Sequence, residues 1–136
     1  GKRAFEVFRK FGHTVVLHEI VANDRKKLSE AIERALKEAD VVLTVGGTGA
    51  SRRDLSVETV RTYVDKELPG FGEMFRALSV KEIGTAAILS RALLGVSTAG
   101  KILVALPGSE GAVRLALEDI LMGELKHLLW ELRRYA

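Results

Sequence analysis

The segment Gly46-Gly47-Thr48-Gly49 has the residue types that point most directly to binding chemistry. Glycine lets the backbone come close to a bulky anion and direct its N–H groups at it, and Thr48 adds a hydroxyl donor. The segment follows the short apolar run Val41–Val45, so it lies at the end of a predicted strand. A phosphate group would fit there, and an ordinary tight turn is an equally good interpretation.

This glycine segment does not match the common nucleotide-binding motifs. A P-loop requires Gly-Lys-Ser/Thr after four spacer residues, but Ser51, Arg52 and Arg53 stand where that signature would close. A dinucleotide-binding fingerprint requires a glycine three residues after Gly49, where the sequence has Arg52. Neither a P-loop NTPase nor a Rossmann dehydrogenase is supported.

Charged residues next to the glycines are of the types that hold a polyphosphate and its Mg²⁺. Arg52 and Arg53 supply fixed positive charge, and Asp54 supplies a carboxylate. Asp24 is available as a second carboxylate. Taken alone, Asp54 is better explained as an acidic residue favoured at the start of a helix.

Three further segments have residues suited to contact anions. Pro107-Gly108-Ser109 combines a close-approach glycine with a hydroxyl group at a helix start, and simple helix capping is its plainer explanation. In Pro69-Gly70-Phe71-Gly72-Glu73, the flanking glycines lead us to expect that Phe71 projects from the chain. Ser90-Arg91 is either an exposed step of a helix or an anion contact.

Alternating helices and strands would position these segments. Apolar and β-branched runs predict strands over residues 13–21, 41–45 and 102–106, and the last two are typical of strands buried on both faces. Periodicity and capping residues predict several helices. The first covers residues 1–11 and ends at Gly12, and the second is capped by Asn23-Asp24 and reaches Ala39. The others are a helix capped by Ser56, a short helix after Pro69-Gly70 that reaches Leu78, a helix over residues 83–96, and a helix capped by Ser109 that continues past Gly123.

This alternation predicts an α/β fold, in which a single domain spans residues 1–136 and the sheet is mainly parallel. Only three strands are clear in the sequence, whereas a sheet covered on both faces usually has about five. Because the first predicted element is a helix, we expect an N-terminal strand that the sequence does not cover. Open parallel sheets bind ligands beyond the carboxyl ends of their strands, so the loops at Asn23-Asp24, residues 46–58 and residues 107–111 should share one edge.

Composition narrows the class of protein. The chain has 136 residues, of which 47% are hydrophobic and 29% charged, and this is the balance of a folded globular domain. A net charge of +3 is too small to require a nucleic-acid partner. The absence of Cys excludes disulfides and thiolate metal sites, and the spacing of His13, His18 and His127 is not that of metal ligands. No run approaches the ~20 apolar residues of a membrane span, and no signal-peptide pattern is present, so we expect a cytoplasmic protein.

The order of these motifs resembles the molybdenum-cofactor biosynthesis proteins of the MoaB/MogA family. The resemblance extends over residues 12–128 and rests on residues 42–49, Arg53-Asp54, Glu58, residues 69–76, Ser90-Arg91-Ala92 and residues 106–112. It implies a three-layer sandwich of the molybdopterin-binding type. It also implies assembly as a homotrimer or a higher oligomer such as a hexamer.

The resemblance also implies an activity. Members of this family bind molybdopterin, and the active ones transfer AMP from Mg-ATP to its terminal phosphate and release pyrophosphate. The implied catalytic carboxylates, which would also contact Mg²⁺, are Asp54 and Asp24. The implied substrate and nucleotide contacts are Gly46, Gly47, Thr48, Gly49, Arg53, Gly70, Gly72, Glu73, Ser90, Pro107, Gly108 and Ser109. The expected partners are molybdopterin, ATP and further copies of the chain, and neither nucleic acid nor a membrane.

Two alternatives stay open. Many catalytic members have an acidic residue where this sequence has Asn23, and this difference favours a protein that binds molybdopterin or the finished cofactor without chemistry. A purely structural trimer would leave both glycine clusters unexplained. The apolar stripe of residues 124–135 would pack either on the domain itself or on another subunit.

Overall fold

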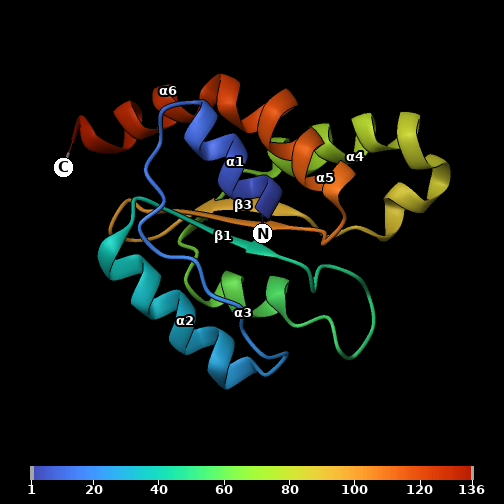
Figure 1. The fold of residues 1–136 in the computed structure, drawn as a ribbon, viewed down its shortest axis with the longest axis horizontal. Coiled ribbons are helices and arrows are strands. Elements are labelled where there is room, and N and C mark those ends of the chain that lie inside the picture. Colours follow the sequence, from blue (N-terminus) through green and yellow to red (C-terminus); the bar gives the residue numbers. More distant parts are fainter. Residues whose placement is uncertain (1, 136) are drawn as a thin grey trace.

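The computed structural model describes residues 2–135 and has helices on both faces of a central sheet (Figure 1). The helices are α1 (Lys2–Lys10), α2 (Arg25–Glu38), α3 (Ser56–Thr62), α4 (Pro69–Ile83), the 3₁₀ helix η1 (Gly84–Leu89), α5 (Glu110–Arg114), the π-helical segment η2 (Leu115–Leu121) and α6 (Met122–Arg133). The strands are β1 (Val41–Val45), β2 (Lys66–Glu67), β3 (Leu93–Val96) and β4 (Ile102–Leu106). The strands over residues 41–45 and 102–106 and the first two helices are therefore confirmed, although Gly1 lies outside the described residues. Burial on both faces is confirmed for β4 but is wrong for β1, in which only Val42 is buried.

The sheet is mixed. Its strand order over the described residues is β1-β4-β3-β2. β1 and β4 are parallel, with Val45 opposite Leu106, whereas β3 is antiparallel to both β4 and β2. The prediction of a mainly parallel sheet is therefore wrong, because residues 83–96 do not form the predicted helix. An apolar run as short as Leu93–Val96 has no distinctive periodicity, and its pairing with β4 makes it a strand.

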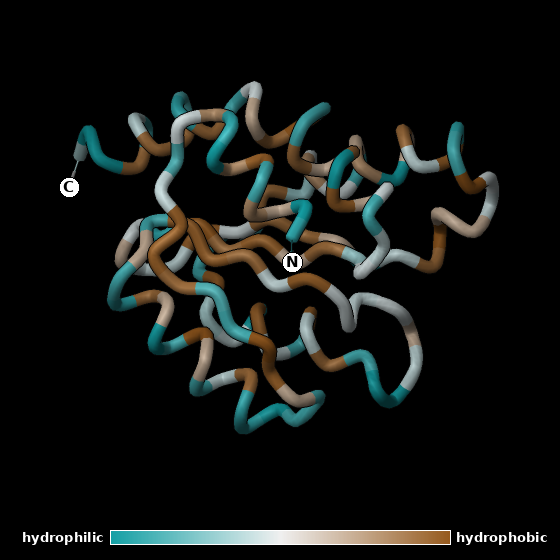
Figure 2. The backbone as a smooth tube through the Cα atoms, in the orientation of Figure 1, coloured by the Kyte–Doolittle hydropathy of each residue, from teal (hydrophilic) through white to brown (hydrophobic). Residues whose placement is uncertain are grey.

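Strand β4 separates two hydrophobic cores. Ile102, Val104 and Leu106 face a core formed with α1, α4, η2 and α6, and Leu103 and Ala105 face a second core formed with α2 and α3. Figure 2 shows hydrophobic residues along the strands in the middle of the molecule and hydrophilic residues along the outer helices. The expected three-layer α/β sandwich is confirmed.

The predicted strand over residues 13–21 is wrong. This segment has no strand in the structure, and its Ile20 side chain is fully exposed. A strand forms only where its backbone groups find ladder partners, and a cavity of about 870 Å³ lies between this segment, α2 and β1. The outer edge of β1 has no partner among residues 2–135. The additional N-terminal strand stays a prediction.

The second glycine cluster forms the start of a long helix. α4 begins at Pro69, which is well suited to the first helical turn because it has no N–H group. Phe71 is buried, and its ring stacks on that of Phe75 with centroids 6.4 Å apart, so the expectation that Phe71 projects is wrong. The reason is helical spacing, which places both rings on the face of α4 that meets the core.

The C-terminal helix packs on its own domain. Leu125 is buried, and Leu128, Leu129 and Leu132 pack against the core that contains α1 and α4. Trp130 stays half exposed, with the Arg134 guanidinium 5.0 Å above its ring. Of the two predicted destinations for this tail, the structure therefore shows the domain itself. No helix within residues 2–135 is both long and apolar enough to cross a membrane.

Gly72 and Gly70 offer a matched test of packing at the start of α4. A Cβ atom at Gly72 would lie 2.9 Å from the backbone oxygen of Ala92, whereas one at Gly70 would meet nothing within 4 Å. We expect Gly72→Ala to lower the free energy of unfolding by roughly 1–3 kcal/mol. Gly70→Ala should change it by less than about 1 kcal/mol, in the stabilising direction, because alanine favours helix. Urea denaturation of both variants checks this, and equal effects would contradict it.

Candidate functional site

Two glycine-containing loops meet at the carboxyl ends of β1 and β4. Because these strands are parallel, the loop over residues 46–55 and the turn over residues 107–109 emerge at the same edge of the sheet (Figure 1). The amide of Gly46 donates a hydrogen bond of 2.7 Å to the Leu106 carbonyl. A Cβ atom at Gly108 would lie 3.7 Å from Gly46 Cα. The prediction that these segments share one edge is confirmed.

Backbone geometry explains the glycines of the first loop. Gly46 and Gly47 have φ angles of 98° and 70°, a region that disfavours other residues. A Cβ atom at Gly47 would also lie 2.4 Å from the Ser56 hydroxyl oxygen. The Ser56 amide donates to the Gly47 carbonyl at 3.1 Å, so Ser56 lies buried beneath the loop. The prediction that Ser56 caps α3 is therefore wrong, because Leu55 occupies the cap position.

Asp54 is fixed and ionised within this loop. Its Oδ2 atom accepts hydrogen bonds from the Ser51 amide at 2.8 Å and from the Ser51 hydroxyl at 2.7 Å. These bonds, first of all the one from the hydroxyl, hold the pKa of Asp54 below its usual value, and the charge of Arg91 adds to this. A Cβ atom at Gly49 would lie 2.7 Å from the same Oδ2 atom, so glycine makes room for the carboxylate.

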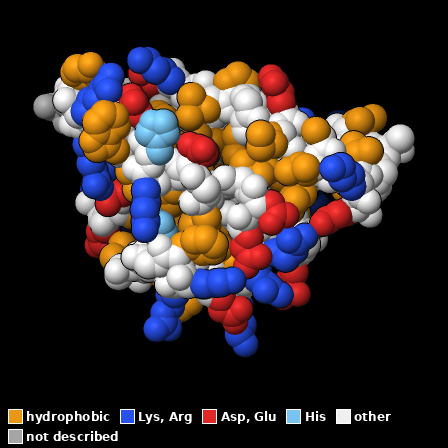
Figure 3. Space-filling view, turned by 90° about the horizontal axis from the view of Figure 1, so that it is seen from above, with side chains coloured by type: hydrophobic (Ala, Val, Ile, Leu, Met, Phe, Trp, Pro, Cys, Tyr) orange, Lys and Arg blue, Asp and Glu red, His pale blue; other side chains and the backbone are white. Residues whose placement is uncertain are grey.

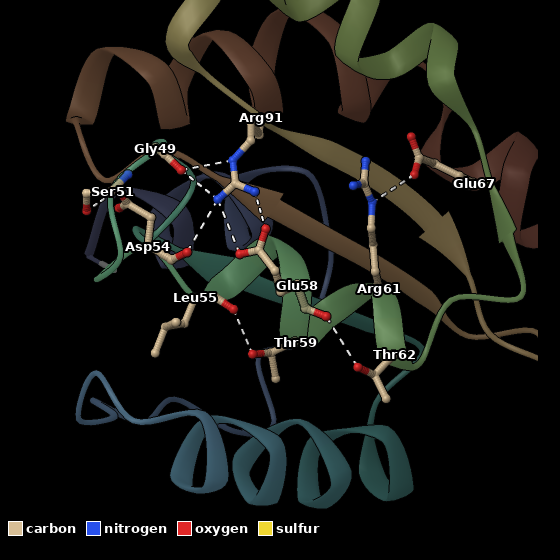
Figure 4. Close-up of polar contacts among 10 residues, drawn as sticks. All are labelled: Gly49, Ser51, Asp54, Leu55, Glu58, Thr59, Arg61, Thr62, Glu67 and Arg91. Atoms are coloured by element: carbon tan, nitrogen blue, oxygen red, sulfur yellow. Dashed lines mark hydrogen bonds and ion pairs between the residues drawn. The ribbon is translucent and has the colours of Figure 1, made fainter.

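Arg91 lies beneath the loop and binds protein groups. Its guanidinium donates to the Gly49 carbonyl and to both carboxylate oxygens of Glu58 on α3 (Figure 4). The alternative of an exposed helical step is therefore wrong, since residues 90–92 connect η1 to β3, whereas an anion contact by Ser90-Arg91 stays a prediction. The hydrogen bonds from Ser51 to Asp54 and from Arg91 to Glu58 were not predicted, and Glu58 and Arg91 are 33 positions apart in the sequence.

The Asp24 carboxylate accepts hydrogen bonds from the backbone of the helix that follows it. Its Oδ1 atom accepts from the amides of Lys26 at 2.8 Å and Lys27 at 3.3 Å, so it caps α2 as predicted. The neighbouring Asn23 lines the 870 Å³ cavity, and Arg53 and Asp54 line the same cavity. No group of three or more His, Asp or Glu side chains within residues 2–135 is arranged to hold a metal ion. A Mg²⁺ ion beside Asp54 would therefore draw most of its ligands from bound phosphates and water, which is its usual preference.

The remaining predicted contact residues differ in their hydrogen bonds and in their exposure. The Ser109 hydroxyl accepts from the Ala112 amide at 3.2 Å, which confirms it as a cap, and Gly108 and Ser109 are exposed. The Ser90 hydroxyl accepts from the Ala92 amide at 3.3 Å. Other positions differ in exposure: Arg53, Gly70 and Glu73 are exposed, Pro107 is half buried, and Thr48 and Gly72 are buried.

The Glu58–Arg91 pair should make stability depend on pH. The hydrogen bond from Arg91 holds the pKa of Glu58 below its usual value, so the pair stabilises the fold above the unfolded-state pKa near 4.3. This contribution is lost as the pH falls through the lower folded-state pKa. We expect Glu58→Gln to be less stable than wild type at pH 7, and the difference to shrink towards pH 3. Urea titrations at several pH values measure it.

The exposed pair of Arg61 and Glu67 provides the control for this titration. Exposed ion pairs contribute little to stability, so Glu67→Gln should follow the wild-type curve at every pH. A pH-independent loss in Glu58→Gln would show that packing, and not charge, is the contribution of Glu58.

Comparisons with known proteins agree with this architecture. A family model described as "Probable molybdopterin binding domain" matches residues 1–127. Molybdenum cofactor biosynthesis protein B of Bacillus cereus is 42% identical over 137 residues, which cover 98% of this chain and 80% of that protein. The protein of the same name from Halalkalibacterium halodurans is 45% identical over 130 residues, which cover 93% and 76% of the two chains.

Solved structures of similar proteins agree with these sequence comparisons. The tungsten cofactor synthesizing protein MoaB from Pyrococcus furiosus superposes with a TM-score of 0.89 at 40% identity, and the match covers 98% of this chain and 84% of that one. A crystal structure of molybdenum cofactor biosynthesis protein B gives a TM-score of 0.92 at 41% identity, with the same coverage. The chain therefore belongs to the MoaB/MogA family of molybdenum-cofactor biosynthesis proteins, which share this molybdopterin-binding domain.

Proposed function

We propose that this protein binds molybdopterin at the carboxyl edge of β1 and β4 and transfers AMP from Mg-ATP to its terminal phosphate. The observation that supports this proposal best is the ionised Asp54 carboxylate held within a glycine loop, which lies against the Pro107-Gly108-Ser109 turn. This arrangement puts backbone amides, hydroxyl groups and a carboxylate at one edge. A cytoplasmic location is part of the same proposal.

The proposed reaction is a nucleotidyl transfer, which is a displacement at the α-phosphorus of ATP. An oxygen of the molybdopterin phosphate attacks the α-phosphorus of ATP, a new P–O bond forms, and the bond to the β-phosphate oxygen breaks as pyrophosphate leaves. A phosphate nucleophile is already ionised at neutral pH, so this step needs no strong general base. Positioning and charge neutralisation supply most of the rate acceleration.

Each part of the site has a role in this proposal. Gly46–Gly49 and the exposed Arg53 contact the triphosphate, and Asp54 contacts the Mg²⁺ that arrives with ATP. Ser90, Gly70, Gly72, Glu73 and the Pro107-Gly108-Ser109 turn contribute to the molybdopterin side. Asp24 is the second carboxylate of the proposed pair.

One observation favours the alternative of a binding protein without catalysis. The Asp24 carboxylate accepts two amide hydrogen bonds as the cap of α2, and Asn23 occupies the cavity lining beside it. If Asp24 serves only as a cap, then Asp54 acts without a second carboxylate. This alternative predicts that molybdopterin binds and that ATP has no effect on it.

Pyrophosphate release from Mg-ATP in the presence of molybdopterin tests the proposal. We expect the wild type to release pyrophosphate and Asp54→Asn to lower the rate by roughly 10²- to 10³-fold, because a charge at the reacting phosphates is lost. Molybdopterin binding should survive this change. Asp119→Asn, which removes an exposed partner of Arg114, is the control and should match the wild type. Binding without release in the wild type would establish the alternative.

Asp24→Asn separates catalysis from capping. Asparagine caps helices as well as aspartate does, so the variant should retain its melting temperature within a few degrees. If the Asp24 charge takes part in the reaction, the rate of pyrophosphate release falls while the stability is kept. An unchanged rate would confine Asp24 to the cap.

We also propose that the protein is a homo-oligomer, a homotrimer in the simplest case, formed through an apolar face on α4 and η1. The side chains of this face are Val80, Ile83, Ile88 and Leu89, and the last two are 77% and 62% exposed. Figure 3 shows hydrophobic side chains at the end of the molecule where α4 and η1 lie. Exposed apolar patches of this kind mark contact surfaces.

Light scattering with two variants tests this face. Ile88→Asp should shift the mass from that of the oligomer to that of the monomer, because a charge would be buried at the contact. Trp130→Asp changes the half-exposed residue of α6 and should leave the mass unchanged. A monomeric wild type, or dissociation by Trp130→Asp alone, would contradict the proposed face.

A further inference from the structure

The loop over residues 46–55 needs hydrogen-bond donors from outside itself. It has no regular secondary structure, and the carbonyls that accept from amides of α3 are those of Gly47, from Ser56, and Leu55, from Thr59. Such groups are costly to leave unpaired where they are partly buried. Within the loop, the Ser51 carbonyl accepts from the Asp54 amide at 3.1 Å. The carbonyls of Thr48, Gly49 and Asp54 are satisfied by a single residue from another part of the chain.

That residue is Arg91. Its amide donates to the Thr48 carbonyl at 3.1 Å. Its Nε and Nη2 atoms donate to the Gly49 carbonyl at 2.9 and 2.6 Å, and Nη2 also donates to the Asp54 carbonyl at 3.3 Å. The guanidinium thus binds the Gly49 carbonyl before the turn and the Asp54 carbonyl after it, and within this turn Ser51 donates to the Asp54 carboxylate, as Figure 4 shows.

Glu58 holds the guanidinium in this position. Both of its carboxylate oxygens accept from Arg91, one of them from Nη2 at 3.2 Å. Glu58 lies on α3 and Arg91 in the connection from η1 to β3, so the pair links the helix after the loop to the start of a strand. A planar guanidinium can serve two carbonyls and a carboxylate at once, whereas an ammonium group is a single point charge.

We propose that Arg91 is a positioning residue, which holds the Asp54 carboxylate at the reacting phosphates by binding the Gly49 and Asp54 carbonyls. It acts through the loop, and its donors are already engaged by protein acceptors. The inference rests on the proposed adenylyl transfer for its effect on rate, but the contact between Arg91 and the loop has its own readout.

Two substitutions and one control test this role. Arg91→Lys retains the positive charge beside Glu58 but loses the planar set of guanidinium donors, and Arg91→Ala loses both the charge and the donors. Arg61→Ala is the matched control, because Arg61 also pairs with a glutamate beside α3, at 3.3 Å, and does not contact the loop (Figure 4). Hydrogen exchange should show faster exchange of amides in residues 46–55 for both Arg91 variants. The amides of β4 should be unaffected, and Arg61→Ala should match the wild type.

The kinetic readout is the Mg²⁺ dependence of pyrophosphate release. A displaced carboxylate binds the metal of Mg-ATP less well, so the half-saturating Mg²⁺ concentration should rise about tenfold in Arg91→Lys. The turnover number should fall about 10²-fold, as expected for a small misplacement of a reacting group. Partial unfolding would lower the turnover number alone and leave the Mg²⁺ midpoint unchanged.

The outcomes separate this inference from the proposed function. If the wild type releases no pyrophosphate, the proposed function fails, and hydrogen exchange still decides whether Arg91 holds the loop. Exchange and Mg²⁺ midpoints equal to those of Arg61→Ala would overturn the role of Arg91. If Arg91→Ala does not fold, Arg91→Lys carries the same comparison.

Discussion

Strand β4 is buried along its whole length, and this burial determines where everything else in the molecule can lie. Helices cover both sides of the sheet, so this strand has no exposed face that could bind a ligand. A ligand of such a sheet meets the loops at the carboxyl ends of its strands. Because β1 runs parallel to β4, the glycine segment after Val45 and the turn after Leu106 come together there.

Irregular backbone beside such a buried strand has to be supported group by group. Gly46 and Gly47 adopt φ angles that keep the loop against the sheet, and the Ser56 amide reaches the Gly47 carbonyl. Arg91 supplies the donors that no neighbouring strand can give. A loop without regular secondary structure can therefore present the Asp54 carboxylate in a defined place.

The two aspartates of the predicted site show why residue type does not settle a role. Asp24 and Asp54 each accept hydrogen bonds from residues two or three positions away, and these local contacts are ordinary capping and turn chemistry. Asp54 stands in the loop after β1, and Asn23, the neighbour of Asp24, lines the same cavity as Asp54. The fold that surrounds each aspartate, and not its neighbours in the sequence, therefore decides which of them can reach a ligand.

The sequence by itself determined the helix from Arg25 to Glu38, the strands β1 and β4, and the order of motifs that identifies the family. These features are encoded locally, by helical periodicity, continuous apolar runs, and glycines at the ends of strands. Only the tertiary structure decided that Leu93–Val96 is a strand, that Phe71 is buried, and that Arg91 binds Glu58 and the glycine loop. Each of these features depends on partners that are remote in sequence, and the residue pattern of one segment does not specify which distant segment it will contact.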